Sequence, residues 1–322
     1  MKRKLFLSAL LVVGLGLLIP FAGFGQTKKD AVDAYNSAAT TYKQDPKAAI
    51  DNLLKAIEIS DQLGEDATEI KVNSESLIPK AYFELAMALY KQKDLQGTLD
   101  NLEKAEETAI KYNDGSTKTR VEKAIPKLYN AMGTNMLKEN KYEEAISNYI
   151  KALNFNPDYL EPNNNLVICY EKTGNETKML EYIDKTIEVA NKLNDQKTIS
   201  DMKLKASNLF KQKAKDAGKD YKLIVENLTN VLKYDNADPD IYRSLTINYS
   251  NMEMWNEAIT SALKAIELKT GLADEKAELY SLLATAYQKI NDTAKACEAY
   301  KNAAYGTFKP NADYQIQQLK CQ

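Results

Sequence analysis

The sequence predicts an all-α protein built from about seven helix-turn-helix units. Two observations lead to this fold class. Only 12 Gly and 8 Pro interrupt the 322 residues, and no alternating run of Val, Ile and Thr indicates a strand. In addition, a stripe of tyrosines, leucines and small residues at helical spacing recurs along the chain. Helices that pack in successive pairs are therefore expected throughout.

The clearest unit lies between Pro126 and Pro157 and reads PKLYNAMGTNMLKENKYEEAISNYIKALNFNP. Its apolar stripes are Tyr129, Met132, Gly133 and Met136 on a first helix, and Tyr142, Ala145, Ile146, Tyr149, Ala152 and Leu153 on a second. Asn140 begins the turn between them. Gly133 and Ala145 are short, as two antiparallel helices require where they approach closely.

This order of large, small and proline positions resembles the tetratricopeptide repeat. The stripe returns in five strong and two partial matches, and the units are expected near residues 30–61, 79–112, 126–159, 160–193, 202–238, 239–272 and 277–305. The resemblance implies a right-handed α-α superhelix over residues 26–322. A polar capping helix at 311–321 is expected to cover the last unit.

The spacing between units is uneven. Leu77-Ile78-Pro79-Lys80 is echoed by Ala124-Ile125-Pro126-Lys127 one long unit later. The additional residues lie mainly between 109 and 122, where Asn113-Asp114-Gly115-Ser116 is a turn signal. Helices longer than the repeat requires are expected here.

Residues 1–25 have the three parts of a secretory signal peptide. Met1-Lys2-Arg3-Lys4 is basic, the segment from Leu5 to Ile19 is apolar, and small residues precede Gln26. Cleavage before Gln26 would yield an exported chain that is periplasmic or associated with the outer membrane. The alternative is an uncleaved inner-membrane anchor formed by residues 5–24. Since no cysteine lies near this site, a lipid anchor is not expected.

Charge and composition exclude several classes of function. The formal charge is −2, and loss of Lys2, Arg3 and Lys4 makes it more negative, so a nucleic-acid partner is not expected. The chain contains no histidine, and it lacks the motifs of metal and phosphate sites. We therefore expect no catalytic residues, no metal and no cofactor, and the chain is not expected to be an enzyme.

The three cysteines have different settings. Cys297 and Cys321 lie in the last two predicted helices, which must pack together, and a disulfide between them is expected. Two unpaired thiols are the alternative. Cys169 lies between Ile168 and Tyr170 on an apolar helix face, which predicts a core position.

The resemblance also implies where a ligand binds, because first helices line the concave surface of such arrays. The matching positions form a groove of apolar and amide side chains: Phe83, Met87, Tyr90, Asn130, Thr134, Leu137, Asn164, Ile168, Glu171, Arg243, Ile247 and Asn251. This lining suits an extended peptide. Packing of some of these residues against the neighbouring unit is the alternative. The lysine of the family's carboxylate clamp is missing.

These features predict an exported scaffold or adaptor that binds a protein or peptide segment. A binding module for a glycan or another envelope ligand is the alternative. Asp292-Thr293-Ala294 resembles the site at which Bacteroidetes attach O-linked glycan, and the Lys- and Asn-rich composition has the look of that phylum. Thr293 is thus a candidate glycosylation site, with an ordinary helix-capping turn as the other interpretation.

Overall fold

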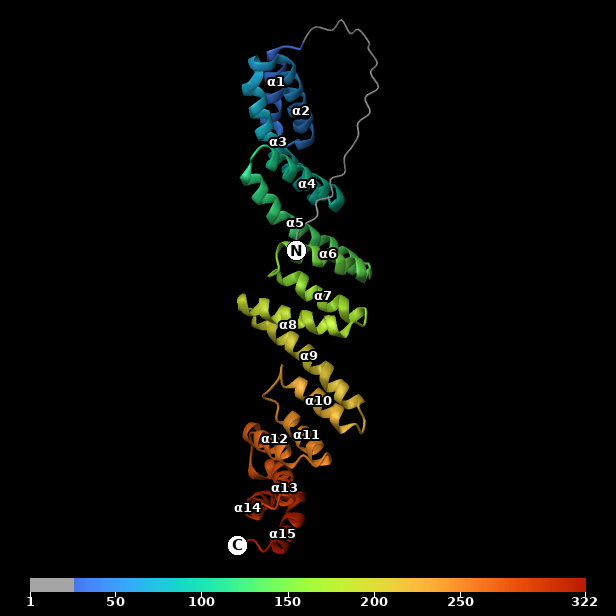
Figure 1. Ribbon diagram of the computed structural model, residues 1–322, viewed down its shortest axis with the longest axis vertical. Coiled ribbons are helices and arrows are strands. Elements are labelled where there is room, and N and C mark those ends of the chain that lie inside the picture. The colour runs from blue at the N-terminus through green and yellow to red at the C-terminus, as the bar shows by residue number, and fades with distance from the viewer. Residues whose placement is uncertain (1–25) are drawn as a thin grey trace. The chain divides into compact units, whose positions relative to one another are not determined.

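The computed structural model describes residues 26–322, and in this range it is all-α. It contains fifteen α-helices, two 3₁₀ helices and no strand (Figure 1). The all-α fold class is therefore confirmed. The expected signal peptide at 1–25 lies outside the described residues. Within the described range, no helix is both long and apolar enough to cross a membrane.

The chain divides into two compact units after Ile125. The described part of unit 1 contains α1 (Lys28–Thr41), α2 (Pro46–Leu63), a 3₁₀ helix (Gly64–Ala67), α3 (Thr68–Lys91), α4 (Leu95–Lys111) and the first half of α5 (Gly115–Lys138). Helices α1 and α2 pack as one antiparallel pair, and α3 and α4 as the next.

Unit 2 continues the pairs from Pro126 onward. It contains the second half of α5, then α6 (Tyr142–Phe155), α7 (Leu160–Lys172), α8 (Glu176–Lys192), α9 (Gln196–Asp216), α10 (Tyr221–Val231), α11 (Pro239–Asn251), α12 (Trp255–Leu268), α13 (Ala273–Lys289), α14 (Thr293–Ala303), a 3₁₀ helix (Gly306–Phe308) and α15 (Lys309–Gln318). Each helix from α6 to α14 packs against the one that follows it.

A short turn with a left-handed residue joins many of these helices. Asn113, Asn140, Asn194 and Asn291 have φ between 57° and 62°, and Gly174 has a φ of 71°. Asparagine and glycine adopt this conformation most readily. The following residue is usually Asp or Asn, and its side chain accepts a hydrogen bond from the N–H three positions on. The local sequence therefore ends one helix and starts the next within a few residues.

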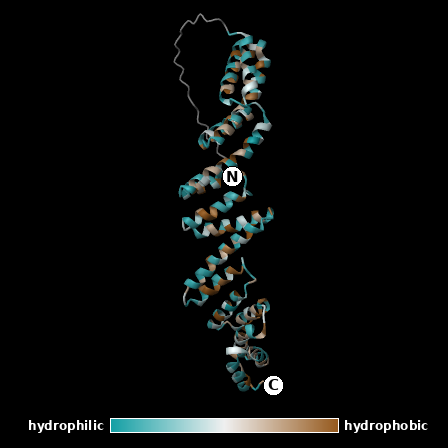
Figure 2. Ribbon diagram, turned by 180° about the vertical axis from the view of Figure 1, so that it is seen from behind, coloured by the Kyte–Doolittle hydropathy of each residue, from teal (hydrophilic) through white to brown (hydrophobic). Residues whose placement is uncertain are grey.

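The core of unit 2 consists of the apolar stripes that face one another. Tyr149 of α6, Leu166 and Cys169 of α7, and Ile183 of α8 are fully buried in one cluster. A Cβ atom added to Gly133 of α5 would lie 2.7 Å from a ring carbon of Tyr149, so the small residue allows the close approach. In Figure 2 hydrophobic and hydrophilic residues alternate along the helices, as in amphipathic helices packed on one side.

Several first helices begin earlier than the expected unit boundaries. Helices α3 and α5 start at Thr68 and Gly115, so Pro79 and Pro126, expected at the starts of units, lie inside them. Helix α9 likewise begins at Gln196 rather than at residue 202. A turn and a capping aspartate before α5 and α9 set the start, and the helix continues through the position that resembles a repeat boundary.

The last helix also differs from the expected bounds of 311–321. It runs from Lys309 to Gln318 with Pro310 in its first turn, where the missing N–H is tolerated. It packs against α14. Because the helix ends at Gln318, Cys321 lies in the segment that follows it.

Candidate ligand-binding surface

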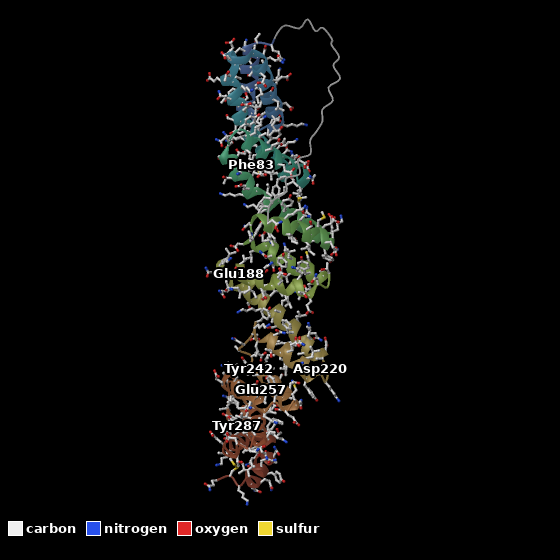
Figure 3. All side chains as sticks on the ribbon, in the orientation of Figure 1. Phe83, Glu188, Asp220, Tyr242, Glu257 and Tyr287 are labelled. Atoms are coloured by element: carbon white, nitrogen blue, oxygen red, sulfur yellow. A yellow bond between two sulfur atoms is a disulfide. The ribbon has the colours of Figure 1, made fainter. Side chains whose placement is uncertain are left out.

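The predicted groove residues of unit 1 lie on α3, and they differ in exposure. Phe83, labelled in Figure 3, is only 7% exposed. The Arg120 guanidinium lies over its ring, 4.0 Å from the ring centroid. The same guanidinium donates to Glu84 at 2.8 Å. Phe83 is therefore a packing residue rather than part of an open groove, as the alternative allowed. Met87 is half-buried and Tyr90 is 41% exposed.

The predicted residues of α5 are engaged within unit 2. The Asn130 amide donates to Glu161 at 2.9 Å, and its carbonyl oxygen is buried with no hydrogen-bond partner. Thr134 donates to the Asn130 backbone carbonyl at 2.8 Å and accepts from the Tyr149 hydroxyl at 3.3 Å. Leu137 packs against the core cluster. These contacts hold the helices together.

Two predicted residues on α7 and α11 are held in ion pairs. Lys205 of α9 donates to both carboxylate oxygens of Glu171, at 2.7 and 2.8 Å. Arg243 of α11 pairs with Glu278 of α13. The remaining predicted residues are partly or fully open: Asn164, Ile168 and Ile247 are half-buried, and Asn251 is exposed.

Within each unit, contacts of this kind connect successive first helices, and we call them the ladder. The partners lie about one repeat apart in sequence: Glu84 with Arg120, Asn130 with Glu161, Glu171 with Lys205, and Arg243 with Glu278, at separations of 36, 31, 34 and 35 residues. Each polar group so engaged already has a partner within the chain. The residues beside the ladder pairs are therefore more available to a ligand than the paired groups themselves.

One pocket of about 590 Å³ lies at the Glu171–Lys205 pair in unit 2. It is formed by the end of α7, the start of α8 and the middle of α9, which follow one another in Figure 1. Its lining residues are Tyr170, Glu171, Gly174, Glu176, Met179, Asp201, Leu204, Lys205, Asn208 and Leu209. Of the predicted groove residues, only Glu171 lies in it.

The pocket has an apolar wall, and its aromatic side chain packs against a neighbouring ring. The Tyr170 ring stacks on Tyr182 with centroids 5.5 Å apart. Burial raises the pKa of the Tyr170 hydroxyl, which therefore stays protonated as a hydrogen-bond donor. Leu204 of α9 is 58% exposed and lines the pocket, where it adjoins the other apolar side chains of the wall.

Sequence reasoning missed the α9 residues because the first helix of that unit departs from the repeat pattern. Since its residues could not be aligned with the repeat, no groove position was predicted on this helix. A signal was nevertheless present in the sequence. Leu204 falls between Lys203 and Lys205, off the stripe of buried Met202, Ala206 and Phe210, so it had no place in the core.

A second cavity of about 390 Å³ lies near the C-terminal end of unit 2. It is lined by residues of α12, α13 and α14: Leu263, Ile266, Tyr280, Leu283, Tyr287, Lys295, Glu298, Ala299 and Asn302 (Tyr287 is labelled in Figure 3). Beside it, Asp292 caps α14 by accepting from the Lys295 backbone N–H at 3.2 Å, and Thr293 is exposed. The capping turn is therefore present, and Thr293 is accessible.

The three cysteines take two forms. The structure joins Cys297 of α14 to Cys321 by a disulfide, with a Cα–Cα distance of 5.5 Å. Cys169 is a free thiol and fully buried in the core of unit 2. Among the described residues, no group of three or more acidic or cysteine side chains is arranged to hold a metal ion.

Comparison with known proteins gives a family match in unit 2. Residues 136–174, from the end of α5 through α7, match the family model described as a TPR repeat. No curated protein matches the sequence.

Three solved structures are similar at low identity. YrrB, described as a TPR protein with an unusual peptide-binding site, is 16% identical with a TM-score of 0.30, covering 60% of this chain and 91% of that chain. The TPR2AB domain of yeast Sti1 in complex with pHSP90 is 18% identical with a TM-score of 0.31, covering 91% and 98%. A tetratricopeptide repeat protein from Parabacteroides merdae is 16% identical with a TM-score of 0.28, covering 91% and 99%. The family-model match therefore identifies one TPR repeat at residues 136–174, within the series of consecutive helix pairs of unit 2.

Proposed function

We propose that the chain is an exported, non-catalytic scaffold or adaptor that binds a protein or peptide segment on the surface formed by its first helices. The observation that supports this most is the pocket at α7, α8 and α9, where the large apolar side chain of Leu204 is 58% exposed. An exposed apolar side chain in a concave, partly polar site is typical of a binding surface.

The ladder of polar pairs supports the same function in a second way. It fixes neighbouring first helices to each other at Glu171–Lys205 and at Arg243–Glu278. A surface held in one conformation loses little conformational entropy when a ligand binds. The pairs are therefore proposed to preorganise the surface, while the open residues between them contact the partner.

The test is capture of partners from an envelope extract by the mature chain that begins at Gln26. Bound proteins are cross-linked and identified by mass spectrometry for the wild type and for Leu204→Ser. Leu223→Ser is the matched control, because Leu223 is 41% exposed on α10 and does not line the pocket. We expect at least one protein to be lost with Leu204→Ser and retained with Leu223→Ser.

Two outcomes would contradict the proposal. One is an identical set of captured proteins for the wild type and Leu204→Ser. The other is the absence of any protein partner together with a soluble compound bound to the mature chain in native mass spectra.

The second cavity favours a glycan as the other candidate ligand. The half-buried rings of Tyr280 and Tyr287 lie there beside the polar groups of Asn302 and Glu298. Aromatic faces next to amide and carboxylate groups suit a sugar, which has both apolar faces and hydroxyl groups. Binding of cell-wall oligosaccharides that is lost with Tyr287→Ala would favour this function over the scaffold.

A further inference from the structure

The pocket at α7, α8 and α9 is divided into an apolar and a charged part. Tyr170, Met179, Leu204 and Leu209 supply the apolar part. The charged part contains three carboxylates and one ammonium group, those of Glu171, Glu176, Asp201 and Lys205. A ligand that fills the pocket must therefore satisfy both parts.

Intramolecular ion pairs occupy most of these charges. Lys205 is bound to Glu171 at 2.7 Å, and Glu176 is bound to Lys213 at 2.6 Å. Asp201 has no ion-pair partner among the described residues, and it is exposed on α9 three positions before Leu204. On a helix, positions three apart lie on the same face, so the carboxylate and the exposed leucine are neighbours.

The juxtaposition of an exposed leucine and an unpaired carboxylate selects one kind of ligand. Resting on the proposed function, we infer that this pocket takes a peptide segment in which a large apolar side chain stands next to a lysine or arginine. The apolar side chain packs on Tyr170, Met179 and Leu204, and the cation lies against Asp201. The expected ligand is therefore positively charged, unlike a terminal carboxylate. Binding of a terminal carboxylate would need the clamp lysine, which this surface lacks.

The two contacts contribute differently. Burial of a large apolar side chain supplies most of the affinity, whereas an exposed charge pair adds little to it and acts mainly on selection between ligands. An acidic peptide would place its carboxylates near Asp201 and near the already paired Glu171 and Glu176. The ratio of the affinities for a basic and an acidic peptide is therefore the quantity that depends most on Asp201.

The test is selection of random heptapeptides displayed on phage against the mature chain, followed by fluorescence anisotropy with the most enriched peptide. We expect enrichment of a large apolar residue adjacent to Lys or Arg. A second labelled peptide, in which that basic residue is replaced by Glu, should bind more weakly. Asp201→Asn should reduce the ratio of the two affinities by about twofold to fivefold.

Two further variants complete the design. Leu204→Ser should weaken both peptides by about tenfold or more, because it removes the apolar contact. Glu226→Gln is the matched control for Asp201→Asn, since Glu226 is an exposed carboxylate on α10 outside the pocket, and it should leave the ratio unchanged. Circular dichroism of each variant verifies that the helices are retained.

The inference is overturned if the enriched peptides are acidic or show no charge preference. It is also overturned if Asp201→Asn leaves the affinity ratio at the wild-type value. Protein partners that are captured from envelope extract and lost with Leu204→Ser, without enrichment of basic peptides, would refute this ligand class and leave the scaffold function standing. Failure of both capture and peptide selection would refute the scaffold function itself.

Discussion

Gly133 shows how one small residue sets the distance between two helices. A Cβ atom at this position would lie 2.7 Å from a ring carbon of Tyr149, which is fully buried. We expect Gly133→Ala to destabilise the protein by about 1–2 kcal/mol, because the overpacking cost exceeds the gain in helix propensity. Urea unfolding measures this change. Gly115→Ala is the control, since its Cβ would meet nothing within 4 Å, and it should be neutral or stabilising.

Cys169 is expected to be unreactive in the folded protein. It is fully buried, and burial raises its pKa to about 11, so about one thiol in a thousand is ionised at pH 8. Iodoacetamide should leave the native protein unmodified for hours and add one group after unfolding without reductant. Rapid labelling of the native chain, or three groups after unfolding, would contradict the core position or the disulfide.

Thr293 is the predicted site of an O-linked glycan. It is exposed at the start of α14, so its hydroxyl is accessible for modification. We expect protein purified from the cells that naturally produce it to be heavier than the polypeptide, and Thr293→Ala to remove the excess mass. An intact mass equal to that of the bare chain would show that Asp292-Thr293-Ala294 is a capping turn only.

The sequence could predict which face of the first helices carries open residues, but not which of those residues were already engaged. The repeat register placed Glu171 and Arg243 between the packing positions. Their partners, Lys205 and Glu278, lie in the next unit, and no pattern within one unit reveals them. A comparison of charges one repeat apart would have done so. Phe83 was misplaced for the same reason, because Arg120 covers it from the following helix.

At the scale of the helices, capping residues determined the boundaries better than prolines did. Pro79 and Pro126 were expected at the starts of repeat units, and proline is most common in the first turn of a helix. Both instead lie inside long helices, although an interior proline loses one backbone hydrogen bond. For α5, the stronger signal was the turn at Asn113, with its φ of 58°, followed by the capping carboxylate of Asp114.

Such caps make a pH-dependent contribution to stability. The Thr198 hydroxyl at 2.7 Å and the Thr198 backbone N–H at 3.1 Å donate to Asp195 at the start of α9, and they lower the pKa of its carboxyl. Because the pKa is lower in the folded chain, this stabilisation is present at neutral pH and is lost as the pH falls through the folded pKa.

The variant Asp195→Asn separates the charge from the cap. Asparagine still accepts the backbone hydrogen bond but cannot ionise, so the variant should be less stable than the wild type at pH 7. The difference should shrink toward zero as the pH falls below the ordinary pKa of aspartate. Thermal unfolding of both proteins from pH 7 to pH 2.5 measures it. A difference that stays constant with pH would show that the charge contributes nothing.

At the scale of the whole molecule, stability is distributed over neighbouring helix pairs. In unit 2 each helix from α6 to α14 packs mainly against its sequence neighbours, as in other repeat proteins. The end of such an array is its weakest part, because the last pair has a neighbour on one side only. Here α15 covers α14, and the bond between Cys297 and Cys321 ties the segment after α15 back to α14.

The disulfide should therefore stabilise the end of unit 2 rather than the whole chain. It closes a loop with a sequence separation of 24 residues, which corresponds to about 3 kcal/mol of chain entropy in the unfolded state. We expect reduction to accelerate amide hydrogen exchange in α14 and α15 and to leave α7 and α8 unchanged, since local opening of a terminal pair does not require the interior to unfold. The double variant Cys297→Ser and Cys321→Ser should behave like the reduced protein and show no response to reductant. If exchange rises equally in α7 and α8, unit 2 unfolds as one cooperative block and the nearest-neighbour description of its stability is wrong.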